Sequence, residues 1–143
     1  MMTGILHGRW EKNLFRILVM LATLQMFYTI YWLGLEVLGR LGLWPDMLVN
    51  FDLAAFLRSE SEFNLIAILV FTFLYSVGYF LILWRKAAAV WFLALAFIVG
   101  RLDWIGLTFN LVFDNFVGGA YELVLQAIIV LLGWDLRGRG VLR

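Results

Sequence analysis

Four long apolar runs constrain this chain more than any other feature of its sequence. They cover residues 17–38, 65–84, 87–107 and 116–134, and each is close to the roughly 20 residues that a helix needs to cross about 30 Å of hydrocarbon. Backbone amides inside a bilayer must find their hydrogen bonds within the chain, so each run is predicted to be a transmembrane helix. A membrane β-barrel would need alternating polar and apolar residues, and the runs do not alternate.

The composition agrees with lipid as the main solvent of this chain. Of its 143 residues, 64% are hydrophobic and 15% are charged, whereas soluble chains average about 45–50% and about 25%. So few polar residues could not cover the surface of a water-soluble domain of this size. Neither a repeat nor a linker interrupts the sequence, so residues 1–143 are predicted to form one all-α transmembrane domain, a four-helix bundle.

The basic residues predict how the bundle is oriented. Eight of the eleven lie on one side of the four spans, and this side is expected to be cytoplasmic because loops rich in Lys and Arg stay there. These eight are also expected at the membrane surface: Arg9, Lys12, Arg16, Arg85, Lys86, Arg137, Arg139 and Arg143. Both termini are then cytoplasmic, and the compact loops and strong charge bias fit a bacterial inner membrane.

Two shorter amphipathic segments are predicted outside the spans. Before the first span, Trp10 and Phe15 interleave with basic residues, which is typical of a short helix lying on the cytoplasmic headgroups. The outer loop at 40–63 holds Pro45 followed by Asp46, a favourable start for a helix. Apolar residues then recur at helical spacing and predict an amphipathic helix on the outer membrane face: Met47, Leu48, Phe51, Ala54 and Ala55.

Four ionisable residues fall in the outer third of the predicted spans and form the candidate site: Glu36, Arg101, Asp103 and Glu122. An ionisable side chain inside a span is costly, so it normally faces protein or water. Arg101 is expected to pair across the bundle with Glu122 or Glu36. Arg101 and Asp103 are two residues apart, about 200° around a helix, so they are not expected to pair with each other. Asp103 would face the outer water layer or another subunit.

This charge cluster allows two interpretations. It could be a ligand site or an ion or proton path, or it could be a network that fixes how the helices pack. A transporter usually carries polar groups through the full depth of its bundle, whereas here the inner half is nearly bare. Gln25, Thr23 and Thr72 are the clear polar residues at mid-depth. The packing interpretation is therefore favoured.

Small residues and aromatic residues predict contact surfaces. Ala96 with Gly100, and Thr72 with Ser76, are spaced four apart, and such pairs let helices approach closely, within the bundle or against a partner. Aromatic residues make up 17% of the chain, more than four helices can bury. Those that face outward could contact lipid, another membrane protein or a flat apolar ligand such as a quinone, a carotenoid or a sterol.

Catalytic chemistry has little support in the sequence. There is no Cys, and His7, the one His, precedes the first span, so a Ser–His pair or a metal cluster cannot form inside the membrane. We therefore expect a non-catalytic accessory or structural subunit of a larger membrane complex, in contact with lipid and other subunits, without a cofactor of its own and without nucleic acid. The alternative is a small carrier or lipid-binding protein that uses the charge cluster. A weaker third hypothesis is an enzyme that acts on lipid through Asp103 or Glu122.

Overall fold

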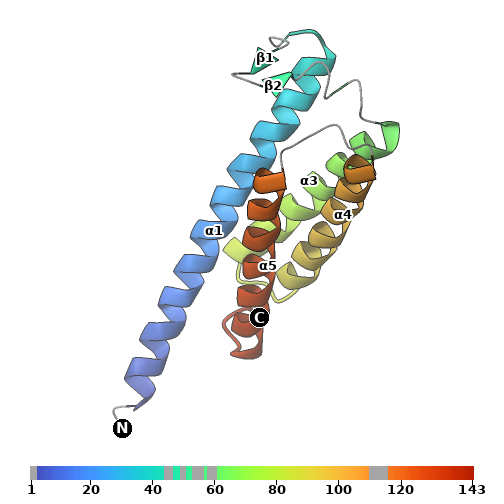
Figure 1. Cartoon of the computed structure of the whole chain (residues 1–143). Coiled ribbons are helices and arrows are strands. Elements are labelled where there is room, and N and C mark those ends of the chain that lie inside the picture. Colours follow the sequence, from blue (N-terminus) through green and yellow to red (C-terminus); the bar gives the residue numbers. More distant parts are fainter. Residues whose placement is uncertain (1–2, 44–46, 49–50, 53–56, 58–60, 110–115) are drawn as a thin grey trace.

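The computed structural model describes residues 3–43, 47–48, 51–52, 57, 61–109 and 116–143, and within these ranges the chain forms four long helices (Figure 1). The helices are α1 (Thr3–Arg40), α3 (Glu62–Leu83), α4 (Ala89–Phe109) and α5 (Phe116–Gly138). The four predicted helices are thus confirmed as helices. Among the described residues, two stretches are long and apolar enough to cross a membrane, Trp10–Arg40 in α1 and Glu62–Leu83 in α3.

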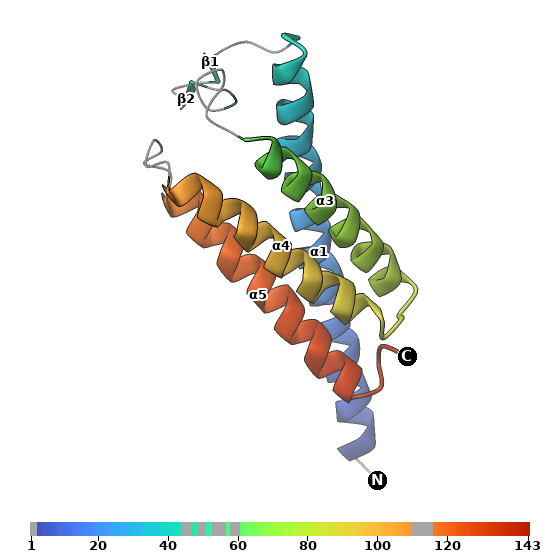
Figure 2. The same cartoon turned by 90° about the vertical axis from the view of Figure 1, so that its right-hand side faces the viewer.

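The four helices form a bundle in which each helix packs against two others, and Figure 2 shows α3, α4 and α5 in front of α1. The most extensive contact joins α3 to α4; α1 packs against α3 and α5, and α4 packs against α5. The α3–α4 pair is close because Gly78 faces Leu93, and a Cβ atom built on Gly78 would lie 2.9 Å from Leu93 Cγ. The missing side chain of Gly78 therefore sets how near the two helices come.

The core consists of one stripe of buried residues from each helix. In α4, Ala89, Leu93 and Ala96 are buried, and their spacing of three and four residues places them on one face. Tyr75 of α3 is the largest fully buried side chain, and its hydroxyl donates a hydrogen bond to the backbone oxygen of Ala22 at 3.2 Å. This bond satisfies the one polar atom of the Tyr75 side chain and ties α3 to α1.

Local sequence signals set where the helices begin and end. Before α3, the Asn64 amide donates to Ser61 Oγ and the Ser61 amide donates to Asn64 Oδ1, each at 3.3 Å, so the two residues cap the helix reciprocally. After α1, Gly42 has a φ of 67°, and the Leu43 amide donates to the Leu38 oxygen at 2.9 Å. Glycine adopts this left-handed conformation without steric cost, which ends the helix there.

The N-terminal segment differs from its prediction. The expected short surface helix is not a separate element, because α1 runs unbroken over 38 residues, about 57 Å. Nothing in the sequence between the basic segment and the apolar run breaks a helix, since neither Pro nor Gly occurs from Arg9 to Leu33. The N-terminal turns of α1 consequently extend beyond the end of α5 (Figures 1 and 2).

The outer loop also differs from its prediction of an amphipathic helix. Met47–Leu48 and Phe51–Asp52 of this connection between α1 and α3 form two short antiparallel strands, β1 and β2, with Leu48 opposite Phe51, whereas Leu57 is helical. Residues three apart lie on one face of a helix, but they can also face each other across a tight hairpin, so the apolar spacing did not distinguish the two structures. Ala54 and Ala55 lie outside the described residues.

Candidate functional site

A cluster of polar side chains lies inside the bundle where α1, α4 and α5 meet. Arg101 of α4 lies beside Glu122 of α5, with 4.0 Å between Nη2 and Oε1. The same Arg101 nitrogen donates to Gln126 Oε1 at 3.3 Å, and Gln126 Nε2 donates to Glu122 Oε1 at 2.6 Å. From α1, Gln25 Nε2 donates to Glu122 Oε1 at 3.4 Å. One carboxylate oxygen is therefore approached by side chains of three helices.

Burial differs between the amides and the charged groups of this cluster. Gln25 and Gln126 are 1% and 2% exposed, whereas the side chains of Arg101 and Glu122 are 18% and 20% exposed. The Arg101–Glu122 pair carries no net charge, and the two amides take the place of water as donors to the carboxylate. A charged pair with such partners is far less costly in an apolar interior than an isolated charge.

Beside this cluster, α1 carries two buried oxygen atoms that have no hydrogen-bond partner among the described residues. They are Gln25 Oε1 and Thr29 Oγ1, on side chains four residues apart and thus on one face of the helix. Leaving such an atom unsatisfied costs about 1–3 kcal/mol. Each of these two oxygens therefore keeps an unused capacity to accept a hydrogen bond.

The predicted ionisable residues do not all lie together. Of the two acids expected opposite Arg101, Glu122 is the one that lies beside it. Glu36 is buried, and its ion pair is with Arg40, one turn later on α1. The side chain of Asp103 lies outside the described residues. Whether any of these residues forms a functional site stays a prediction.

Sequence reasoning missed Gln126, although this side chain contacts both charges of the cluster. The inventory of polar residues at mid-depth was therefore incomplete. The missed signal was the spacing of Glu122 and Gln126, which are four apart and share one face of α5. Thr23, another polar residue predicted at mid-depth, lies outside the cluster. Its hydroxyl donates a hydrogen bond to the Val19 oxygen at 2.7 Å and shares a second hydrogen bond with the Tyr79 hydroxyl at 3.1 Å.

The small residues proposed for helix packing lie at helix contacts. Ala96 is fully buried in the core, and a Cβ atom built on Gly100 would lie 3.2 Å from the Phe71 ring, so Gly100 faces α3. Ser76 Oγ lies 3.8 Å from Met26 Sδ on α1. Thr72 Oγ1 is buried without a hydrogen-bond partner among the described residues. The tighter contact at Gly78 was not predicted.

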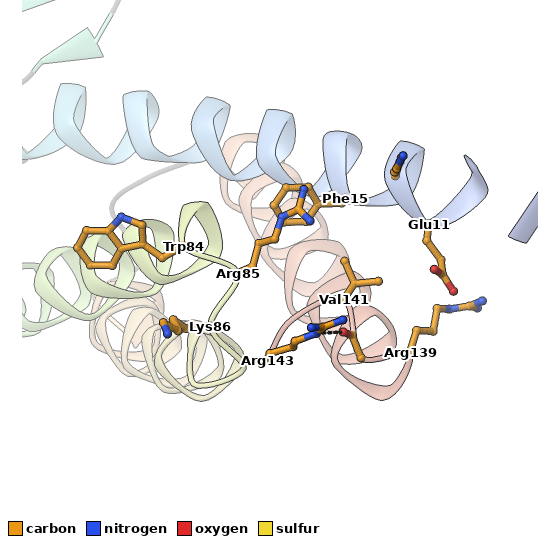
Figure 3. A pocket seen from close by; sticks show the side chains of 10 residues that line it. Glu11, Phe15, Trp84, Arg85, Lys86, Arg139, Val141 and Arg143 are labelled. Carbon is orange, nitrogen blue, oxygen red and sulfur yellow. Dashed lines mark hydrogen bonds between the residues drawn. The ribbon is translucent and has the colours of Figure 1, made fainter. Parts of the chain in front are cut away.

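The basic residues predicted at the membrane surface separate into groups. Arg137 lies over the rings of Trp91 and Trp134, at 5.2 and 5.5 Å from their centroids. Arg16 is exposed, and the side chain of Arg9 lies outside the described residues. The other five line one pocket of about 530 Å³ (Figure 3), and they are Lys12, Arg85, Lys86, Arg139 and Arg143.

Within the described part of the chain, no group of three His, Cys, Asp or Glu side chains could hold a metal ion. Comparison with known proteins gives no match either, whether to a protein-family model, to a curated protein or to a solved structure. A function must therefore be inferred from the polarity of the bundle, the polar cluster and the basic pocket.

Proposed function

We propose that this chain is an integral membrane protein of four spans with both termini in the cytoplasm, and that it serves as a non-catalytic subunit of a larger membrane complex. The spans would be α1, α3, α4 and α5, with the basic pocket on the cytoplasmic side. A bacterial inner membrane is the proposed location. The observation that carries the membrane assignment is the apolar outer surface of the bundle, combined with polar side chains buried between the helices.

Large apolar side chains are exposed on all four helices, while several polar side chains are buried between them. Phe27 of α1 is 69% exposed and Leu131 of α5 is 70% exposed, whereas Gln25 and Glu36 are almost fully buried. In the most apolar stretch of α1 only 22% of the residues are buried inside the bundle, and in that of α3 only 28% are. Burial in the core of a soluble protein therefore does not explain why these stretches are so apolar. In water such a surface would aggregate, but in lipid it is matched to its solvent.

The topology can be tested directly because the chain has no cysteine. Single cysteines introduced as Leu43→Cys and Lys86→Cys lie at opposite ends of the bundle, and both positions are exposed. In intact cells, a membrane-impermeant maleimide should label Leu43→Cys and leave Lys86→Cys unlabelled. It should label Lys86→Cys only after the membrane has been opened. Labelling of both variants in intact cells would contradict the proposed topology.

The subunit role is supported by the outward face of α1. An apolar stripe at spacings of three and four residues follows this face and is exposed: Ile17, Met20, Leu24, Phe27 and Tyr31. Towards its N-terminus α1 also extends past α5, so the other helices do not cover it there (Figures 1 and 2). Such a face can pack against a helix of another membrane protein. By contrast, the Arg101–Glu122 pair is bonded within the chain.

The experiment is extraction of the tagged chain from its native membrane in mild detergent, followed by mass spectrometry of the proteins that co-migrate with it. A partner in fixed stoichiometry is expected. Phe27→Ala on α1 should release this partner, while Phe73→Ala on α3, an equally exposed phenylalanine, should retain it. A chain that emerges alone, or with contaminants of variable amount, would contradict the subunit role.

A second candidate function is a carrier for a small polar ligand, and it is favoured by the unsatisfied oxygens of Gln25, which contacts Glu122, and of Thr29, one turn further along α1. In that case the protein should purify as a monomer or homo-oligomer. Gln25→Leu should then abolish uptake in a transport assay with little effect on folding, whereas Thr23→Val, outside the cluster, should leave uptake unchanged. If the complex dissociates with Phe27→Ala and Gln25→Leu has no phenotype, the carrier function is excluded.

A further inference from the structure

The pocket at the basic end of the bundle is built from three parts of the chain. α1 contributes Lys12, the α3–α4 connection contributes Arg85 and Lys86, and the segment after α5 contributes Arg139 and Arg143 (Figure 3). The volume of about 530 Å³ falls in the range of small-molecule sites. One acidic side chain, Glu11, also lines the pocket and points toward Arg139 (Figure 3). Positive charge therefore dominates the lining.

The C-terminal segment of the pocket is fixed by backbone hydrogen bonds. The Arg143 amide donates to the Arg85 oxygen at 2.7 Å, and the Ala87 amide donates to the Arg143 oxygen at 2.9 Å. Gly140, with a φ of 72°, turns the chain back after α5, and Leu142 is buried in the core. The basic residues of this segment are thus held against the α3–α4 connection and form a defined site rather than a freely moving basic tail.

The cations of the pocket differ in how they are already engaged. Arg139 donates to Asp135 at 2.7 Å, and this hydrogen bond together with the charge of Asp135 holds the pKa of Arg139 above its ordinary value. Arg85 lies over the Phe15 ring at 4.6 Å, and Arg143 Nε donates to the Gly140 oxygen at 3.2 Å.

Lys12 and Lys86 have no hydrogen bond or ion pair among the described residues, although they line the same pocket from different elements. An ammonium group can present three donors to a phosphate. The two lysines therefore retain their full capacity to bind an anion, while the arginines are partly engaged and shape the walls.

We propose that this pocket binds the phosphate headgroup of an anionic membrane lipid, with Lys12 and Lys86 supplying positive charge from two different sides of its lining. The lipid source is favoured because a tryptophan, typical of a membrane interface, lines the site. Trp84 lines the pocket, and at the same ends of α4 and α5 Trp91 and Trp134 meet edge to face with 5.1 Å between their ring centroids. Basic pockets on the cytoplasmic side of membrane helices bind anionic headgroups in this way. The inference rests on the proposed membrane placement and is independent of the subunit role.

The test measures binding of soluble short-chain lipids to the purified full chain in mild detergent, by titration with native mass spectrometry. The probes are short-chain phosphatidylglycerol, short-chain phosphatidylcholine and glycerol 3-phosphate. Phosphatidylglycerol should bind most tightly. Lys12→Gln and Lys86→Gln should each weaken it about fivefold, and the double variant about thirtyfold. Arg16→Gln is the matched control, because it removes one charge a single turn along α1 from Lys12 but outside the pocket lining.

Each alternative outcome contradicts a different part of the inference. Equal binding of phosphatidylglycerol and phosphatidylcholine would refute an anion site, and an equal loss in Arg16→Gln and Lys12→Gln would show diffuse surface charge instead of a pocket. Binding of glycerol 3-phosphate as tight as that of the lipid would refute the lipid source. A chain that fails to insert into phosphatidylcholine bilayers would instead refute the membrane assignment itself, so the two failures can be told apart.

Discussion

The closest helix contact in the bundle offers the sharpest test of the packing, through the substitution Gly78→Ala. The added Cβ atom would lie 2.9 Å from both Cγ and Cδ2 of Leu93 and 3.3 Å from its backbone nitrogen, compared with an ordinary carbon contact of about 3.5–4.0 Å. Because Leu93 is itself buried in the core, it has little room to move, and α3 and α4 must separate. Overpacking by one methyl group costs about 1–3 kcal/mol, offset in part by the roughly 1 kcal/mol by which Ala favours a helix over Gly.

The matched control for Gly78→Ala is Gly34→Ala in α1, where a Cβ atom would meet nothing within 4 Å. Both variants gain the same helix propensity, so their free energies of unfolding should differ by the overpacking cost alone, about 1–3 kcal/mol in favour of Gly34→Ala. Unfolding would be followed by helical circular dichroism during titration of the detergent-solubilised protein with dodecyl sulfate. In Gly100→Ala the added Cβ atom would lie 3.2 Å from the Phe71 ring, so the free energy of unfolding of this variant should lie between those of Gly78→Ala and Gly34→Ala. If Gly78→Ala is as stable as Gly34→Ala, the close α3–α4 approach is refuted.

Three further predictions use the same unfolding titration. Arg101→Leu should destabilise the protein by about 2–3 kcal/mol, because it leaves the Glu122 carboxylate without its cation. Adding Glu122→Leu in the same chain should recover part of this stability. If the double variant instead loses the sum of the two single losses of stability, the pairing is contradicted. Gln25→Leu should change stability by less than about 1 kcal/mol, because one of its polar atoms is already unsatisfied, and a loss above about 2 kcal/mol would contradict this. Leu142→Ala should cost about 2–3 kcal/mol and expose the segment after α5 to protease, and unchanged protease resistance would show that the buried leucine does not hold that segment.

The helices could be predicted from the sequence because their signal is long and uniform. Each apolar run exceeds the length of any ordinary strand, and no Pro interrupts it. The errors fall on short segments, where few residues carry the signal. At Met47–Leu48 and Phe51–Asp52 the same apolar spacing satisfies a helix and a hairpin. Around Trp10 the sequence changes from basic to apolar residues. This change indicates where a helix could pass from water into lipid, but it does not indicate whether the helix ends there, and α1 continues through it.

The composition of the polar cluster could be predicted only in part, for a geometric reason. Sequence position gives the depth of Glu36 and Glu122 along their helices, and both depths suit a pair with Arg101. Choosing between them requires the rotation of each helix about its axis, which depends on packing that a single sequence does not show. The spacing of Glu36 and Arg40 would have favoured a local pair, because residues four apart on a helix are neighbours. The same rule applied to Glu122 would have found Gln126.

The geometry of the cluster also limits how it could take part in any function. Glu122 Oε1 accepts from Gln25 on α1 and from Gln126 on α5, and it lies 4.0 Å from Arg101 on α4. A change of charge at this oxygen, by protonation or by a bound cation, would weaken its contacts on all three helices at once. The Gln25–Glu122 hydrogen bond is one of several contacts that hold α1, together with the Tyr75 bond to the Ala22 oxygen and the packing of Leu18 and Ala22 in the core. A change at Glu122 would therefore loosen one polar contact of α1, the helix whose outward face is the proposed docking surface.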